Sequence, residues 1–106
     1  MTNRSGAEAH LSKLLMAVGR WEAHSGRATF DSQVAHLVSE VGEAYQAFRH
    51  GGDPRPELAD VFLAALYFAA RGMRPDGYSD GGRDPDVGAL LDAAEAKAAE
   101  LEGRMR

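Results

Sequence analysis

The sequence contains no cysteine. This absence excludes disulfide bonds, thiolate catalysis and cysteine-ligated zinc. The sequence also shows no cluster of positive charge. Sixteen acidic residues outnumber twelve basic ones, and the formal net charge is −4. Binding to a nucleic acid polymer normally requires clustered basic residues that displace counterions. We therefore expect no nucleic acid polymer among its partners.

Long apolar runs are absent as well. The longest, Val61 to Ala70, has about half the length that a membrane-spanning helix requires. The first residues, MTNRSGAEAHL, lack the apolar segment of a signal peptide. We therefore expect a soluble, cytoplasmic protein with no membrane partner. A chain of 106 residues forms one domain, residues 1–106, near the lower size limit at which a core stabilises a fold alone.

Few residues are β-branched and no segment alternates with period two, which predicts an all-α fold, a four-helix bundle. Four segments carry apolar residues at helical spacing: Ala7 to His24, Asp31 or Ser32 to Gly51, Pro56 to Gly72, and Asp84-Pro85 through Leu101. In the second segment, Asp31 or Ser32 is the expected cap and the glycine pair at 51–52 the expected end. The Gly-, Asp- and Pro-rich stretch from Met73 to Arg83 predicts a mobile loop.

The third segment is apolar around nearly its whole circumference from Val61 to Ala70, which is typical of a helix buried on all sides. A chain this small has little material to cover it. We expect a homo-oligomer, a homodimer or homotetramer, with this helix at or near the interface. The alternative is that the fourth helix and the loop cover it within one chain. The short connection Gly51-Gly52-Asp53-Pro54-Arg55 predicts that the second and third helices are antiparallel neighbours.

Two pairs of acids stand out, Glu40 with Glu43 and Glu57 with Asp60. Because residues three apart share one face of a helix, an antiparallel hairpin can bring both pairs together. Four carboxylates at such short distances repel one another unless cations lie between them or some of them are protonated. A set of ligands made only of oxygen atoms suits Mg²⁺ or Mn²⁺. The alternative is two solvated helix faces, with Glu57 favoured near a helix N-terminus. Gly42, inside the first pair, indicates a close approach by a backbone, a ligand or a crossing helix.

The stretches LVSEVGEAYQAFRHGG and ELADVFLAALYFAARGM carry these pairs, as Glu40-Val41-Gly42-Glu43 and Glu57-Leu58-Ala59-Asp60. Over about residues 30 to 75 the chain resembles the MazG-like all-α nucleotide pyrophosphohydrolases, whose signature is Glu-x-x-Glu, a spacer and Glu-x-x-Asp. The resemblance implies a helical, oligomeric fold and Mg²⁺ held by the four acids. It also implies hydrolysis of a nucleoside triphosphate, including non-canonical or deoxy forms, to the monophosphate and pyrophosphate.

Two positions differ from many members of that family. Ser39 stands where many have a second glutamate before the first signature acid. Lys97 could serve as the phosphate-contacting lysine of the last helix, but no asparagine follows it. These differences keep a second hypothesis open, a catalytically degenerate metal- or nucleotide-binding helical assembly protein. A di-iron bundle is disfavoured, because it requires Glu-x-x-His motifs and no histidine here lies three residues after a glutamate.

For catalysis, Glu40 and Glu43 are the candidate residues, and either a metal-binding glutamate or His36 could take the proton of the attacking water. His36 lies one turn before Glu40 on the same side of the helix, although a packed or solvent-facing histidine is the simpler interpretation. Four residues are candidate substrate contacts: Lys97, Arg49, Trp21 and His36. Ordinary surface charge is the simpler interpretation of Lys97 and Arg49, and a core aromatic is the simpler interpretation of Trp21.

Overall fold

The computed structural model describes residues 4–26, 29–73 and 85–106. These residues form four α-helices and no strand, which confirms the all-α prediction. The helices are α1 (Arg4–His24), α2 (Phe30–Arg49), α3 (Arg55–Gly72) and α4 (Val87–Arg104). The loop predicted for residues 73–83 lies outside the described residues, apart from Met73. Among the described helices, none combines the length and apolar character needed to cross a membrane.

Two helices begin at caps that differ from the predicted ones. The N-cap of α2 is Thr29, whose side-chain oxygen accepts a hydrogen bond from the backbone N–H of Ser32 at 3.2 Å. The prediction that Asp31 or Ser32 caps this helix was wrong. Several adjacent residues are able to cap a helix, and here the cap is the residue whose side chain accepts a hydrogen bond from the backbone N–H three positions ahead. The N-cap of α4 is Asp86, which accepts from the backbone N–H of Ala89 at 3.0 Å, so α4 begins later than predicted.

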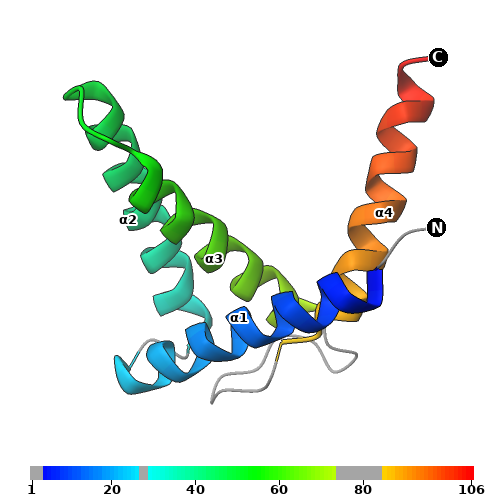
Figure 1. Cartoon of the computed structure of the whole chain (residues 1–106), viewed down its shortest axis with the longest axis horizontal. Helices are drawn as coiled ribbons and strands as arrows, with labels where there is room; N and C mark the ends of the chain where they lie inside the picture. The colour runs from blue at the N-terminus through cyan, green and yellow to red at the C-terminus, as the bar shows by residue number, and fades with distance from the viewer. Residues whose placement is uncertain (1–3, 27–28, 74–84) are drawn as a thin grey trace.

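The hairpin between α2 and α3 forms as predicted. Gly51 adopts φ +73°, a conformation that favours glycine. Its N–H donates to the carbonyl of Phe48 at 3.3 Å, and the N–H of Gly52 donates to the carbonyl of Ala47 at 3.0 Å. These two bonds form a Schellman motif, which ends the helix and reverses the chain. The two helices therefore lie side by side and antiparallel (Figure 1).

The four helices do not close into a bundle within one chain. In Figure 1, α2 and α3 form one arm of a V, α4 forms the other, and α1 crosses the base. Along the described residues, α4 contacts α1 and α3 but does not reach α2. Of the alternative in which α4 and the loop cover α3, the described residues show only the start of α4 packed on α3, through Val87.

The start of α4 is fixed to the base of the V by polar contacts. The backbone N–H of Asp86 donates to the carbonyl of Ala70 at 3.0 Å. On the other side, Nη2 of Arg4 in α1 lies 3.0 Å from the carbonyl oxygen of Gly88 and 2.8 Å from Oδ1 of Asp92. Beyond these contacts, residues 92–106 are exposed, so α4 projects into solvent.

The core lies where α1, α3 and the start of α4 meet. Its buried members are Leu15, Tyr67, Ala70 and Val87, surrounded by partly buried leucines. Where α1 crosses α3, Gly19 faces the ring of Tyr67, and a Cβ there would lie 3.1 Å from the hydroxyl oxygen of that ring. The glycine therefore leaves room for the Tyr67 ring against α1.

A single chain leaves a large apolar surface uncovered. The expectation that α3 is buried on all sides does not hold within one chain, because Leu58 and Phe62 are about half exposed. More apolar surface is exposed on α2, in residues that we call the apolar stripe of α2: Val34, Val38, Val41, Tyr45 and Phe48. These residues are spaced by four, three, four and three positions, which is the spacing of a seam between packed helices.

Candidate functional site

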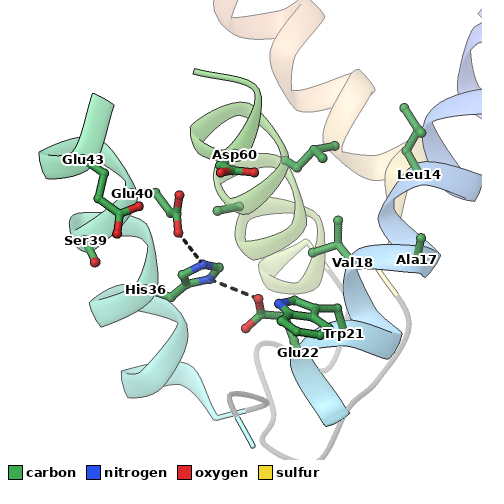
Figure 2. A pocket seen from close by; sticks show the side chains of 12 residues that line it. Leu14, Ala17, Val18, Trp21, Glu22, His36, Ser39, Glu40, Glu43 and Asp60 are labelled. Carbon is green, nitrogen blue, oxygen red and sulfur yellow. Dashed lines mark hydrogen bonds and ion pairs between the residues drawn. The ribbon is translucent and has the colours of Figure 1, made fainter. Parts of the chain in front are cut away.

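A cavity of about 630 Å³ lies between α1, α2 and α3 (Figure 2). Its lining residues are Leu14, Ala17, Val18, Trp21 and Glu22 from α1, His36, Ser39, Glu40 and Glu43 from α2, and Asp60, Leu63 and Ala64 from α3. The lining is of two kinds. Most of the polar groups come from α2 and from Asp60 of α3. The side chains from α1, and from the turn of α3 that comes after Asp60, are mainly apolar.

Three of the four predicted acids line this cavity. Glu40 and Glu43 extend from α2, and Asp60 extends from α3 on the facing side (Figure 2). Glu57, one turn before Asp60, is partly exposed and is not among the lining residues. The described part of the chain contains no group of three or more His, Asp or Glu residues arranged to hold a metal ion. The acids therefore share one cavity without forming a ready chelating cluster.

Glu40 is the most constrained of these acids. Its side chain is only 13% exposed, and its Oε2 atom is buried without a hydrogen-bond partner. Burial raises the pKa of Glu40 above its ordinary value, and the nearby charges of Glu43 and Asp60 raise it further. The hydrogen bond with His36 lowers the pKa and offsets part of this effect. The carboxylate of Glu40 therefore occupies a position that a positive charge would stabilise.

His36 lies between two carboxylates. Its Nδ1 is 3.0 Å from Oε1 of Glu22 on α1, and its Nε2 is 3.0 Å from Oε1 of Glu40 (Figure 2). Glu22 is 2% exposed, so this contact is made in the interior. Of the two simpler interpretations, a packed or a solvent-facing histidine, the structure therefore shows the first, with an acid at each ring nitrogen.

Glu22 was not among the site residues predicted from the sequence. A signal was present, because Glu22 continues the apolar spacing of Leu11, Leu15 and Val18 at the next helical position. An acid on the buried face of a helix requires a polar partner in the interior, which the fold supplies as His36.

Beneath this contact lies a group of buried polar side chains. The hydroxyl of Tyr67 is hydrogen-bonded to Gln33 and Arg71, and the guanidinium carbon of Arg71 lies 5.7 Å from the centre of the Tyr67 ring. All three residues are buried. Burial raises the pKa of Tyr67, while the positive charge of Arg71 lowers it. This group joins α2 to α3, and Gln33 and Tyr67 share a small pocket with Glu22 and His36.

The remaining predicted contacts divide between the cavity and the outer surface. Trp21 lines the cavity and is 57% exposed, so it is not a core residue. Lys97 lies on the projecting part of α4, where Nζ is 2.9 Å from Glu100, away from the cavity. Arg49, at the end of α2, lies over the ring of Tyr45 and does not line the cavity either. One chain therefore does not bring either predicted phosphate contact to the acids.

Gly42 has open space around it. A Cβ at this position would have no neighbouring atom within 4 Å. The close approach of a backbone or a crossing helix, which the sequence suggested, is therefore not made within the described part of the chain.

Comparison of the chain with known protein families, with curated proteins and with solved structures gave no match. The chemistry of the site is therefore argued from its own residues. In the part of the chain that the structure describes, the acidic wall carries no lysine or arginine, so it can bind a cation and, through it, phosphate groups. The apolar wall that carries Trp21 can receive a flat ring by stacking.

Proposed function

We propose that the protein is a Mg²⁺-dependent nucleoside triphosphate pyrophosphohydrolase of the MazG-like kind, with Mn²⁺ as an alternative ion and the active site in the cavity between α1, α2 and α3. The observation that carries this proposal is the buried, unpartnered Oε2 of Glu40 on the same cavity as Glu43 and Asp60. A buried carboxylate oxygen without a partner is costly unless it coordinates or pairs with a positive group.

The residues present fit a hard divalent cation. Glu40, Glu43 and Asp60 offer only carboxylate oxygens, which Mg²⁺ and Mn²⁺ prefer over softer metals. Glu57, one turn before Asp60 on α3, completes the set of four that the sequence signature implies. When bound, such a cation would supply Lewis-acid stabilisation of the negative charge on the phosphate oxygens.

The reaction we propose breaks one bond and forms one. The oxygen of a water molecule attacks the α-phosphorus, the bond from this phosphorus to the bridging oxygen of the β-phosphate breaks, and pyrophosphate leaves with the electron pair. A carboxylate takes the proton of the water. Glu43 is better placed for this step than His36, because Glu43 is exposed on the cavity whereas His36 is already held between Glu22 and Glu40.

The apolar wall is the proposed place for the base. Trp21 offers an exposed indole face beside Leu14, Val18 and Leu63, which suits stacking of a flat ring. Arg49 and Lys97 lie elsewhere, so within one chain the charge of the triphosphate is met by the cation. They would contact the substrate only if a second copy of the chain brought them to the cavity.

Pyrophosphate release with Mg²⁺ from a panel of canonical and modified nucleoside triphosphates tests this proposal. We expect release by the wild type and a loss of at least about 100-fold in Glu43→Gln, because the proton acceptor and a cation ligand are removed together. Glu102→Gln, which changes an exposed acid on α4, is the matched control and should keep full activity. Release that survives Glu43→Gln would show that the site is assigned to the wrong residues.

The second candidate is a catalytically inactive metal- or nucleotide-binding assembly protein. It is favoured by the position of Glu57 outside the cavity lining and by Ser39 where a further acid is common in the family. Isothermal titration of the same nucleotides, with and without Mg²⁺, distinguishes the two. If nucleotides bind and no member of the panel releases pyrophosphate, this second function is supported.

We also propose that a second copy of the chain covers the apolar stripe of α2, giving a homodimer or homotetramer. The stripe continues into a shallow groove of about 330 Å³, whose lining residues are Val41, Ala44, Tyr45, Phe48, Pro54, Leu58 and Val61. None of these side chains carries a charge, and large exposed apolar patches are rare on monomers. Two α2–α3 hairpins packed through this seam would form a four-helix arrangement with self-complementary surfaces.

Sedimentation equilibrium tests the oligomer. We expect the wild type to be dimeric or larger and Val41→Glu to be monomeric, because a charge would be buried in the middle of the seam. Leu101→Glu places the same charge at an exposed apolar position on α4 and should leave the assembly unchanged. A wild type that stays monomeric at high concentration would refute this part of the proposal.

A further inference from the structure

The contact between His36 and Glu40 has a feature that a simple surface ion pair lacks. His36 is itself held by a second acid, Glu22, which comes from a different helix and is almost completely buried. Each nitrogen of the ring lies 3.0 Å from one carboxylate oxygen (Figure 2). The ring is therefore fixed from both ends, and its orientation is set by the packing of α1 against the hairpin.

We propose that His36 is a positioning residue, which Glu22 holds in place and which in turn orients the carboxylate of Glu40 so that its second oxygen is available to a divalent cation. This inference rests on the proposed function, because it gives the bridge a role in binding that cation.

The arrangement of the two oxygens of Glu40 supports this role. His36 engages Oε1, whereas Oε2 is buried and has no hydrogen-bond partner. The charges of Glu43 and Asp60 both act on this carboxylate and raise its pKa, so it lies within their field. The contact with His36 thus occupies one oxygen of Glu40 and leaves the other, Oε2, without a partner beside the charges of Glu43 and Asp60.

The physical benefit is preorganisation. A glutamate side chain loses about 1.5–2 kcal/mol of rotamer entropy when it is fixed, and this loss would otherwise be part of the binding free energy of the cation. Because the ring of His36 already holds Oε1 of Glu40, much of this rotamer entropy is lost on folding and not when the cation binds. Second partners of this kind typically change metal affinity by about 10- to 100-fold when they are removed.

A purely structural role is the competing explanation, in which His36 only ties α1 to α2 through Glu22. Two amide substitutions separate the two roles. In His36→Asn the short side chain places its amide where Nδ1 lies, so it can still reach Glu22 but not Glu40. In His36→Gln the longer side chain places its amide where Nε2 lies, so it can donate to Glu40.

Binding of Mn²⁺ to the full chain, without nucleotide, is the measurement, with free Mn²⁺ followed by electron paramagnetic resonance at one fixed pH. We expect His36→Asn to weaken Mn²⁺ binding by about 10- to 100-fold and His36→Gln to keep most of the wild-type affinity. His50→Asn is the matched control, because His50 lies at the end of the same helix, is exposed, and its Nε2 lies 3.0 Å from Oε1 of Gln46, which is not a proposed ligand. Circular dichroism confirms that each variant is folded.

The outcomes separate the two proposals. If the wild type binds Mn²⁺ and both His36 variants bind equally well, or if both lose affinity equally while folded, the positioning role is refuted and the proposed function stands. If the wild type neither binds Mn²⁺ nor releases pyrophosphate, the proposed function fails, and the positioning role fails with it.

A measurement on the wild type covers the case in which His36→Asn does not fold. In protein labelled with ¹⁵N-histidine, saturating Mg²⁺ should shift the ring resonances of His36 and leave those of His50 in place. The reason is that His36 contacts Glu40, a proposed ligand of the cation, whereas His50 contacts Gln46. Ring resonances of His36 that do not move when Mg²⁺ is bound would overturn the inference.

Discussion

Replacing Glu40 with Gln is expected to stabilise the protein when no divalent cation is present, although the same change should abolish its proposed activity. The charge of Glu40 lies in a nearly buried position, close to the charges of Glu43 and Asp60. A neutral amide of the same shape removes this repulsion. It also keeps a polar group within reach of His36.

The magnitude follows from the buried charge and the sign from the pKa. Gln removes a charge that burial and two neighbouring acids disfavour, and the weaker bond of a neutral amide to His36 offsets part of this gain, so we expect a net gain of about 1 kcal/mol at pH 7. The pKa of Glu40 is raised on folding, so the folded state holds the proton more tightly than the unfolded chain, whose glutamates titrate at about 4.3. The stability that Glu40 contributes is fully present below that value and is lost as pH rises through its folded pKa.

Thermal unfolding followed by circular dichroism, in a chelating buffer at pH 7 and near pH 4, measures the effect. At pH 7 the variant should melt about 4 °C above the wild type, and near pH 4 this advantage should shrink toward zero. Adding Mg²⁺ should stabilise the wild type, by about 2.7 kcal/mol at a hundred times its dissociation constant, and stabilise the variant much less. A variant less stable than the wild type at pH 7 in chelator, or an advantage of equal size at both pH values, would refute this reasoning.

Three further substitutions test the fold, each by urea unfolding. Gly19→Val should lower the free energy of unfolding by about 1–3 kcal/mol, because the added atoms meet the ring of Tyr67; an unchanged stability would mean that α1 and α3 cross less closely. Gly42→Ala should raise it by about 0.5–1 kcal/mol, since nothing lies within 4 Å of the new methyl group; a loss instead would indicate contact with a second copy. Thr29→Ala should lower it by about 1 kcal/mol through loss of the bond to the N–H of Ser32, and no change would mean that another residue caps α2.

Periodicity and glycine placement were sufficient for the local structure. The four helices follow from apolar residues at helical spacing, and the end of α2 follows from Gly51, which tolerates the left-handed conformation that the turn requires. The spacing of Glu40 and Glu43 predicted that both would lie on one side of α2, and both line the cavity. The cap of α2 was less predictable, because Thr29, Asp31 and Ser32 are all able to cap and only backbone geometry selects among them.

The sequence by itself determined which residues share a face of each helix, because that depends only on short-range backbone geometry. The tertiary structure decided which faces meet. The crossing at Gly19 and Tyr67 helps to set the position of α1, and that position brings Glu22 against His36. Such a crossing depends on the packing of residues distant in the sequence, so no local pattern of spacing could have specified it.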